Sequence, residues 1–382
     1  MEKEINILCA SDRFNYGDLI FPHIVIGEMQ RLGDYSFRNV AIVKSDLSKY
    51  EALPTLNYKS LYKKDKQEKS RFLFVAGGEV LGAKWGKLYS FIYKWFYLLY
   101  KYFPRPMYLE LLIRYITGNK NNPIPFTPLS PRLTSTYRVI YNAVGGCGIH
   151  KHSLSKQIQD SFLEALYVSV REENTFDSIH NKLNVESAVL APDSAMLMPE
   201  YFRIEEKKDE KYIVFQVGHQ KNGGSLNLLK TQIESICEKT KLPVYLLPIG
   251  NCPGHDDKIS LEWLHKNLEC PNKLIAPLNV TTIMSCIANS EMFIGTSLHG
   301  VITAMSFNVP YMGINEGIGK LKYYLNTWAP DPLKAIVPIN KIQEKVIEYF
   351  SVDRSILIKC SEEQKEQVRN SFCKIHSLIN DI

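Results

Sequence analysis

The sequence predicts an α/β protein built from two Rossmann-like domains, followed by a C-terminal helical tail. Its 382 residues exceed what one ordinary hydrophobic core accommodates and fit two α/β domains. Short apolar runs alternate with helical stretches, which is the pattern of a parallel sheet wound by helices. The pattern stops at a highly charged segment, 205–211, and then starts again. We therefore expect domains at 1–204 and 205–340 and helices at 341–382.

The strands expected in both domains end in loops that contain glycine, proline or charged residues. In the first domain they lie at 5–10, 40–43, 72–76, 138–144, 166–170 and 188–191. In the second they lie at 212–217, 244–248, 274–276, 292–295 and 310–314. Ligands of open α/β sheets bind at the carboxyl ends of the strands, so the loops after these strands are expected to carry the chemistry.

The composition is that of a folded globular protein, with 45% hydrophobic and 23% charged residues. A net charge of +6 is spread too thinly to indicate nucleic-acid binding, and the basic residues form no recognisable reader module. The eight cysteines show neither a C-x-x-C pair nor zinc-like spacing. They are expected to be reduced thiols of a cytoplasmic protein. The charged N-terminus leads directly into a strand pattern, unlike a signal peptide.

Residues 84–118 form a segment of unusual composition, a predicted helical insertion in the first domain. It contains twelve aromatic residues and six basic ones but a single acid, Glu110. Lys87, Lys94 and Lys101 are seven residues apart and would form one basic stripe along a helix, next to apolar residues such as Trp95. The lysines interrupt the apolar run too often for a transmembrane span. An interfacial helix on an anionic membrane and a core helix with snorkelling lysines both fit this pattern.

The most informative motif is Phe293-Ile294-Gly295-Thr296-Ser297-Leu298-His299-Gly300, which is typical of a strand, a short turn and a helix. His299 would lie in the first helical turn, where free N–H groups and the helix dipole attract anions. Gly300 would leave room for a ligand to approach. A lone histidine is more often structural, but the strand-end position and the adjoining Ser297 favour a functional role.

Asn15-Tyr16-Gly17-Asp18 follows the first strand directly. Such a sequence is a common helix N-cap with a turn glycine, and locally that interpretation is the stronger one. As part of a site, it would place the Asp18 carboxylate at the carboxyl edge of the sheet, where it can accept a proton from a hydroxyl group.

Two weaker motifs follow other strands. Arg171 comes just after the strand at 166–170 and would either grip a carboxylate or phosphate or pair with a nearby acid such as Glu172. The glycine pair Gly77-Gly78 would present N–H groups to an anion, although such pairs are mostly turns.

Taken in chain order, these motifs resemble the polysaccharide pyruvyl transferase family. The resemblance rests on N-x-G-D after the first strand, a glycine pair, S-V-R-E, A-P-D, and S-L-H-G followed by V-P, from about Asn15 to about Lys322. It implies a glycosyltransferase B-like fold, in which two Rossmann-like domains face each other across a cleft. It also implies transfer of pyruvate from phosphoenolpyruvate to a sugar as a cyclic ketal, with no cofactor and no metal.

The resemblance also assigns roles to residues. It makes His299 the general acid, Asp18 the acceptor-side carboxylate and Arg171 a ligand of the donor anion. The remaining motif residues would contact substrates: Asn15, Gly17, Gly77, Gly78, Ser297, Leu298 and Gly300. The family often has arginine where this chain has Ser297, and Lys320 is the residue expected to compensate.

Two other functions remain open at this stage. One is a nucleotide-sugar glycosyltransferase of the same architecture, although the one pair of glutamates eight positions apart, Glu164 and Glu172, lies in the first half of the chain. The other is a non-catalytic membrane-surface assembly protein built around 84–118. If the enzyme also docks on the inner face of the membrane, its acceptor would be a glycan on polyprenyl diphosphate.

Overall fold

The chain divides into two units, each built around its own parallel sheet. The computed structural model describes residues 2–63, 70–117, 119, 121–205, 210–276 and 278–382. Unit 1 comprises Met1–Ser194 and Gln367–Ile382, and unit 2 comprises Ala195–Glu366. The sequence placed the boundary after residue 204, whereas the observed boundary follows Ser194. Most of the predicted linker, 206–209, lies outside the described residues.

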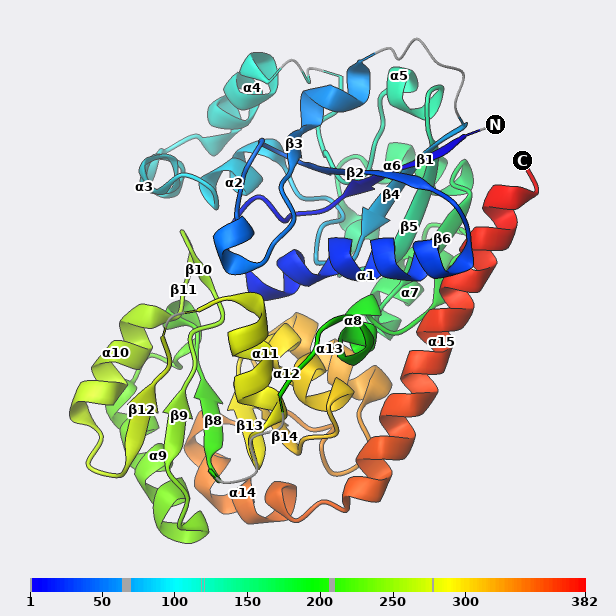
Figure 1. Cartoon of the computed structure of the whole chain (residues 1–382). Helices are drawn as coiled ribbons and strands as arrows, with labels where there is room; N and C mark the ends of the chain where they lie inside the picture. Colours follow the sequence, from blue (N-terminus) through cyan, green and yellow to red (C-terminus); the bar gives the residue numbers. More distant parts are fainter. Residues whose placement is uncertain (1, 64–69, 118, 120, 206–209, 277) are drawn as a thin grey trace. The chain divides into compact units, whose positions relative to one another are not determined.

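Unit 1 contains a seven-stranded sheet in the order β3-β2-β1-β4-β5-β6-β7, in which all neighbouring strands are parallel (Figure 1). In β1, Ile5 pairs with Phe37 of β2 on one side and with Phe72 of β4 on the other. The central strands are continuous apolar runs because both faces of the sheet are covered. The strands are β1 (Lys3–Leu8), β2 (Ser36–Ala41), β3 (Leu56–Asn57), β4 (Ser70–Ala76), β5 (Arg138–Val144), β6 (Tyr167–Val170) and β7 (Val189–Leu190).

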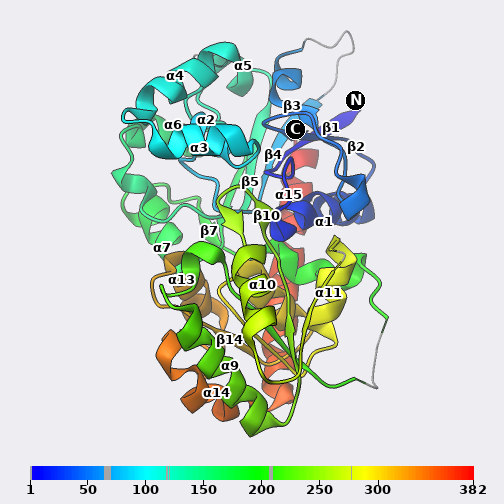
Figure 2. The ribbon, with the colours of Figure 1, turned by 90° about the vertical axis from the view of Figure 1, so that its left-hand side faces the viewer.

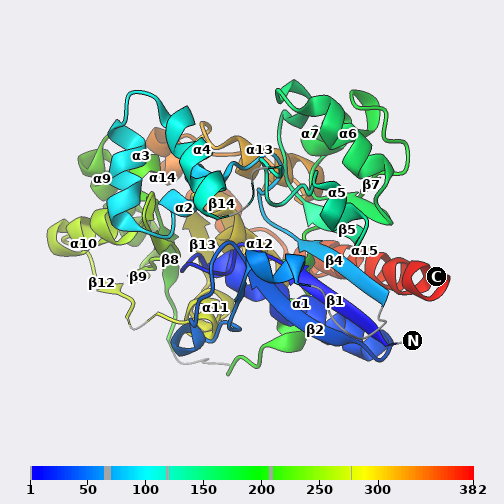
Figure 3. The same ribbon diagram turned by 90° about the horizontal axis from the view of Figure 1, so that it is seen from above.

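The helices of unit 1 cover the two faces of this sheet (Figure 3). Leu73 and Val75 of β4 belong to a buried cluster with residues of α2 and α6, whereas Phe74 points to the other face and stacks on Phe372 of α15, with ring centroids 6.1 Å apart. The helices are α1 (Tyr16–Leu32), α2 (Trp85–Ser90), α3 (Lys94–Tyr102), α4 (Pro106–Ile116), α5 (Pro131–Thr134), α6 (Ser155–Leu163), α7 (Glu173–Phe176) and the last part of α15 (Arg354–Asn380).

Unit 2 contains a five-stranded parallel sheet in the order β12-β9-β8-β13-β14, together with a short antiparallel hairpin, β10-β11. Its strands are β8 (Ile213–Gln216), β9 (Val244–Leu246), β10 (Asn251–Cys252), β11 (His255–Asp256), β12 (Asn272–Leu274), β13 (Met292–Gly295) and β14 (Tyr311–Gly313). Its helices are α8 (Met198–Tyr201), α9 (Leu226–Thr240), α10 (Lys258–Asn267), α11 (Val280–Ala288), α12 (Leu298–Ser306), α13 (Gly319–Trp328), α14 (Ile342–Phe350) and the first part of α15.

The C-terminal tail is helical, as predicted for 341–382. It does not form a separate part of the chain, however, because its residues divide between the two units. Residues up to Glu366 belong to unit 2, and the last sixteen complete unit 1. There the hydroxyl of Tyr35 lies 2.7 Å from Nδ1 of His376, and the hydroxyl of Tyr167 donates to Ser371 at 3.0 Å. The end of α15 is therefore an integral helix of the first Rossmann-like unit.

The predicted single helix at 84–118 is wrong in detail, because the structure contains three short helices, α2, α3 and α4. Lys87 belongs to α2, whereas Lys94 and Lys101 belong to α3, so the three lysines do not form one stripe along a common axis. Gly118 lies outside the described residues. Among the helices that are described, none has both the length and the apolar character needed to cross a bilayer.

Candidate functional site

Both sheets reverse their strand order at one point, and the predicted site residues gather at these two points. In unit 1 the order reverses between β1 and β4, and in unit 2 between β8 and β13. The crevice outside the carboxyl ends of the strands at such a switch point is where open α/β sheets bind ligands. Asn15, Asp18, Gly77 and Gly78 follow β1 and β4, and Ser297 and His299 follow β13.

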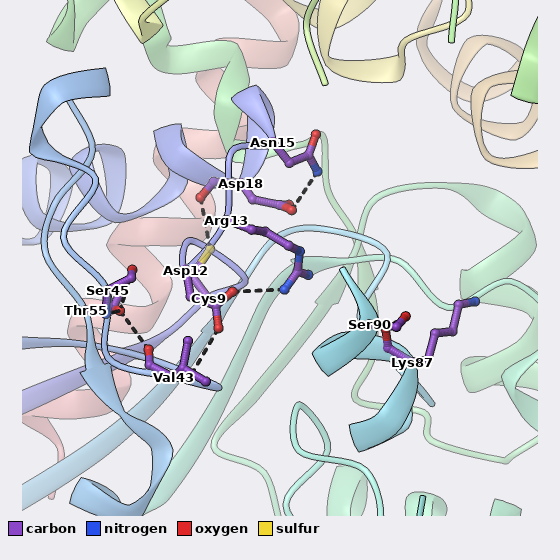
Figure 4. Close-up of polar contacts among 10 residues, drawn as sticks. All are labelled: Cys9, Asp12, Arg13, Asn15, Asp18, Val43, Ser45, Thr55, Lys87 and Ser90. Atoms are coloured by element: carbon purple, nitrogen blue, oxygen red, sulfur yellow. Dashed lines mark hydrogen bonds and ion pairs between the residues drawn. The ribbon is translucent and has the colours of Figure 1, made fainter. Parts of the chain in front are cut away.

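The unit 1 switch point brings Asn15, Asp18 and the glycine pair together. Figure 4 shows Asn15 beside Asp18. Nδ2 of Asn15 donates to Oδ2 of Asp18 at 2.7 Å, so Asn15 orients the carboxylate instead of capping α1 with its side chain. Oδ1 of Asp18 lies 3.5 Å from where a side chain on Gly78 would begin. Gly77 and Gly78 both have positive φ, 50° and 77°, and a side chain on Gly77 would also meet the Phe21 ring. The pair therefore forms a tight turn beside the Asp18 carboxylate.

The loop between β1 and α1 is held by a buried ion pair that sequence reasoning missed. Nη1 of Arg13 donates to Oδ1 of Asp12 at 2.9 Å, and Oδ2 of Asp12 accepts the Val43 N–H at 3.1 Å. Burial raises the pKa of Asp12, although Arg13 and the Val43 N–H oppose the shift. Arg13 also lies over the ring of Phe91, 5.7 Å from its centroid, so the end of α2 borders this loop. The sequence signal that could have revealed this pair is an acid next to a base, Asp12-Arg13, in a loop directly after a strand.

Gly17 is buried in the first turn of α1, where its side of the helix faces the protein interior. The sulfur of Cys9 at the end of β1 donates to the Asp18 carbonyl at 3.3 Å and ties this turn to the strand. Burial, with Asp18 next in importance, raises the pKa of the Cys9 thiol, which therefore stays neutral. Gly17 is thus a packing position at the base of the site.

Arg171 does not present its guanidinium to a ligand, which corrects the donor-binding role expected for it. Only 1% of the residue is exposed, and three carboxylates surround it. Nη1 lies 3.0 Å from Asp193, Nη2 lies 3.1 Å from Glu79 and Nε lies 3.4 Å from Glu172. Burial works to lower the Arg171 pKa, but the carboxylates outweigh it and the net shift is upward. The structure therefore has the alternative arrangement, pairing with neighbouring acids.

The Arg171 cluster fixes the loop after β4. Oε2 of Glu79 is held by Arg171, and Oε1 of Glu79 accepts the Cys147 N–H at 3.0 Å. The Glu79 side chain is one-third exposed, whereas those of Glu172 and Asp193 are buried. Burial raises the pKa of Glu172 to about 7. Arg171 opposes the shift, whereas the carboxylates of Glu79 and Asp193 add to it. Arg171 is a positioning residue for Glu79, next to the glycine pair.

In unit 2, His299 lies in the first turn of α12, directly after β13. Oγ of Ser297 accepts the Gly300 N–H at 3.2 Å, which caps the helix, and the His299 carbonyl accepts the Thr303 hydroxyl at 2.7 Å. His299 is 8% exposed and Ser297 is partly exposed, whereas Leu298 is buried and offers only its backbone. A side chain at Gly300 would meet the Phe293 ring. Packing against β13 is therefore sufficient to require glycine at position 300.

A buried polar network holds the loops of the unit 2 switch point in register. Oε1 of Gln216 accepts the Thr296 N–H at 3.0 Å, and Nε2 of Gln216 donates to Oδ2 of Asp257 at 2.8 Å. The same Asp257 oxygen accepts the N–H groups of Ile249 and Gly250, each at 3.0 Å. Burial raises the pKa of Asp257 despite these donors. The loops after β8, β9 and β13 are thus joined through one carboxylate.

Lys221 is a partly buried cation in the loop after β8, and sequence reasoning missed it. A β-carbon on Gly218 would lie 3.4 Å from Cδ of Lys221 and 3.3 Å from Oδ1 of Asp257, so both side chains pack close to this glycine. Burial lowers the pKa of Lys221, and Asp257 partly compensates. Its position in the sequence could have revealed it. Lys221 follows the first strand of the second sheet, just as Asn15 and Asp18 follow the first strand of the first sheet.

Lys320 lies partly buried near the start of α13, in the turn that leaves β14. Asn315 of the same turn donates to the Lys221 carbonyl at 2.9 Å, so the loops after β14 and β8 are joined. Two lysines therefore lie on connected loops at the carboxyl edge of the unit 2 sheet.

Comparisons with known proteins agree with this architecture. The sequence model of the family described as polysaccharide pyruvyl transferase matches residues 15–317. No protein of curated function is significantly similar in sequence.

Solved structures show that the fold is the glycosyltransferase B-like one, with two Rossmann-like domains. The UDP complex of MnaA from S. aureus has 12% identity and a TM-score of 0.56, with coverage of 96% of this chain and 92% of that one. A putative UDP-N-acetylglucosamine 2-epimerase from Listeria monocytogenes has 9% identity and a TM-score of 0.57, with coverage of 100% and 98%. UDP-GlcNAc 2-epimerase from Methanocaldococcus jannaschii, in complex with UDP-GlcNAc and UDP, has 12% identity and a TM-score of 0.52, with coverage of 93% and 94%.

Proposed function

Because this chain belongs to the polysaccharide pyruvyl transferase family, we propose that it moves pyruvate from phosphoenolpyruvate onto a sugar as a cyclic ketal. The observation that carries the proposal is the position of His299, in the first turn of α12 at the switch point of the unit 2 sheet. A proton donor next to an anion-attracting helix end suits a donor substrate that carries a phosphate and a carboxylate.

Unit 2 is the proposed donor side. The N–H groups at the start of α12 and the ammonium group of Lys221 attract the two anionic groups of phosphoenolpyruvate. Lys320 adds positive charge on the joined loop after β14, in place of the arginine that relatives often have at the position of Ser297. Bound phosphate and carboxylate in turn favour the protonated imidazole of His299.

Unit 1 is the proposed acceptor side. Asp18, oriented by Asn15 and adjacent to Gly78, is placed at a switch point where a sugar hydroxyl can give up its proton. Glu79 is held by Arg171 and its side chain is one-third exposed, so it is a second carboxylate that can accept hydrogen bonds from sugar hydroxyls. The acceptor is further proposed to be a glycan on a polyprenyl diphosphate, modified on the cytoplasmic side of the membrane.

The reaction balances with these groups. His299 protonates the methylene carbon, which leaves an oxocarbenium-like centre at the carbon that bears the phosphate and carboxylate. One sugar hydroxyl adds there and loses its proton to Asp18. Phosphate then leaves, and a second hydroxyl closes the ketal. Of the two hydroxyl protons, one replaces the proton that His299 gave, and the other leaves with the phosphate.

The first test compares donors. The purified protein is incubated with a glycan acceptor and either phosphoenolpyruvate or a panel of nucleotide sugars, and release of phosphate and of nucleotide is measured. The proposal expects phosphate release from phosphoenolpyruvate only in the presence of acceptor. Nucleotide release would instead support a glycosyltransferase, the alternative raised by the fold, and no release from any donor would support a non-catalytic role.

The first mutational prediction concerns His299. His299→Ala is expected to slow phosphate release by about a hundredfold to ten-thousandfold, the usual contribution of a general acid. His265→Ala is the matched control, because His265 lies exposed near the end of α10 and bonds Asn272. Equal rates for the two variants would remove His299 from the mechanism.

A further inference from the structure

Two adjacent helices of unit 1, α3 and α4, expose long stripes of apolar side chains. Helices α2, α3 and α4 lie together at one end of unit 1 in Figures 1 and 2. The exposed fractions of Trp95, Tyr102 and Tyr115 are 64%, 72% and 65%. Their exposed apolar neighbours are Leu98, Leu99, Phe103, Met107, Tyr108, Leu111, Leu112 and Ile116. Trp95, Leu98, Leu99 and Tyr102 share one face of α3, and Tyr108, Leu111, Leu112 and Tyr115 share one face of α4. We call this set the apolar patch.

The apolar patch is carried on a firmly anchored base. Trp85 of α2 is fully buried, and its indole N–H donates to the Asn122 carbonyl at 2.6 Å. Phe96 is the buried residue of α3, and Leu109 and Ile113 form the buried face of α4. Each helix thus has a buried apolar face as well as an exposed one. The exposed stripes are therefore additional to what folding requires, which marks an interaction surface.

The charge of this region is one-sided. Glu110 is the one acid in 84–117, and it is turned inward. Oε2 of Glu110 accepts the Gly86 N–H at 2.6 Å, and Oε1 accepts the Tyr100 hydroxyl at 2.7 Å. Five of the six basic residues, Lys84, Lys87, Lys94, Lys101 and Arg105, are exposed, and Arg114 is partly exposed. The surface around the apolar patch thus carries positive charge, because the only carboxylate of the segment is buried and accepts hydrogen bonds from the protein itself.

We propose that the apolar patch docks unit 1 on a lipid bilayer that contains acidic headgroups. Helices of nine and eleven residues are too short to cross a membrane, but their apolar faces can lie in the interfacial plane. Trp and Tyr side chains suit that boundary, because each has an apolar body and a polar end. A second copy of this chain fits less well, since two identical positive surfaces would repel each other. The inference concerns location and does not depend on the reaction proposed above.

The test is co-sedimentation of the full chain with vesicles. Vesicles of phosphatidylcholine alone are compared with vesicles that contain about 30% phosphatidylglycerol, at low and high salt. We expect strong binding to acidic vesicles, weaker binding as salt rises, and weak binding to neutral vesicles. Equal binding to both vesicle types would overturn the role of charge, and no binding to either would overturn the proposal.

Paired variants separate the two contributions. Lys94→Gln with Lys101→Gln should weaken binding to acidic vesicles by about 25-fold, at about fivefold for each lysine. Leu98→Ala with Leu112→Ala should weaken it by about tenfold or more. The matched controls are Lys258→Gln with Lys266→Gln and Leu163→Ala with Ile259→Ala, because these residues are similarly exposed elsewhere on the chain. Vesicle binding by the patch variants equal to that of the controls would contradict the assignment.

Two further measurements exclude other occupants and misfolding. Sedimentation velocity without lipid would reveal a dimer, and a dimer lost in Leu98→Ala with Leu112→Ala would assign the patch to a second copy instead. Thermal unfolding checks that the variants fold, as expected for side chains that are about half exposed, 47% for Leu98 and 49% for Leu112. Phosphate release with a soluble acceptor should be unchanged in every patch variant, whether or not lipid binding is lost.

Discussion

Lys221 could not be predicted from sequence motifs. It belongs to no motif of the family pattern, yet it lies partly buried in the loop after β8, close to Asp257 and to the switch point. A partly buried ammonium group is costly unless an anion compensates it. Burial lowers the pKa of Lys221 from its ordinary value, and Asp257 opposes this shift only in part. A bound donor anion would supply the remainder.

The prediction for Lys221 is a loss of donor affinity. Lys221→Gln should raise the KM for phosphoenolpyruvate by roughly tenfold to a hundredfold, the value of a charge-assisted hydrogen bond, with a smaller effect on kcat. Lys221→Arg should restore part of the affinity, since it keeps the charge. Lys241→Gln, at the exposed end of α9, is the control. A change in kcat alone would argue against donor binding by Lys221.

Glu172 allows a pH prediction at the residue scale. Burial raises its folded-state pKa from 4.5 to about 7, so the folded protein binds this proton more tightly than the unfolded chain does. The stabilisation is complete below about pH 4.5 and is lost as the pH rises through 7. Relative to Glu172→Gln, which mimics the protonated acid, the wild-type free energy of unfolding should fall by up to about 3 kcal/mol across that window.

Urea unfolding at a series of pH values measures this difference. Glu164→Gln is the control, because Glu164 is exposed at the end of α6 and should leave the pH dependence of stability as it is in the wild type. Parallel pH profiles for the wild type and Glu172→Gln would show that the Arg171 cluster holds Glu172 ionised throughout.

At the scale of elements, the turn after β4 combines two constraints at one glycine. Gly77 has a positive φ, and a side chain there would also meet the Phe21 ring of α1. Gly148 has a similar φ, 71°, but open space around it. The two positions therefore separate the cost of the backbone conformation from the cost of the close approach of α1.

We expect Gly148→Ala to lower the free energy of unfolding by roughly 1 kcal/mol, the cost of a left-handed backbone for an L-residue. Gly77→Ala should cost roughly 1–3 kcal/mol more, because the ring of Phe21 must move as well. Urea unfolding of the two variants checks this. Equal losses would mean that α1 yields easily, and that Gly77 does not fix the position of Asp18.

At the scale of the whole molecule, the sequence predicted what depends on periodicity. Apolar runs between helical stretches predicted both parallel sheets. The strand ends predicted that Asp18 lies at the carboxyl edge of the first sheet and that the glycine pair follows a strand, but not that the two meet. The missed β3 is only two residues long and both are exposed, so it has no apolar signal. Three-dimensional packing decided the rest. The end of α15 returned to unit 1, where Phe372 meets Phe74.

Charge neutralisation was the other feature that spacing could not predict. Arg171 had the sequence position of an anion ligand, but Glu79 and Asp193, 92 and 22 residues away, converge on it in the fold. Lysine spacing likewise predicted the basic surface at 84–118 only in part. The turn between α2 and α3 separates Lys87 from the other two lysines, and Glu110 turns inward.

The proposed reaction requires the transfer of an intact three-carbon unit from phosphoenolpyruvate to the sugar. Phosphoenolpyruvate labelled with carbon-13 at the carbon that bears the phosphate should give, with the wild-type chain and a glycan acceptor, a product whose NMR spectrum shows the label as a ketal carbon bonded to two sugar oxygens. Asp18→Asn should bind the donor normally but form little of this product. Label recovered only as free pyruvate, or left in unreacted donor with every acceptor tested, would contradict the account.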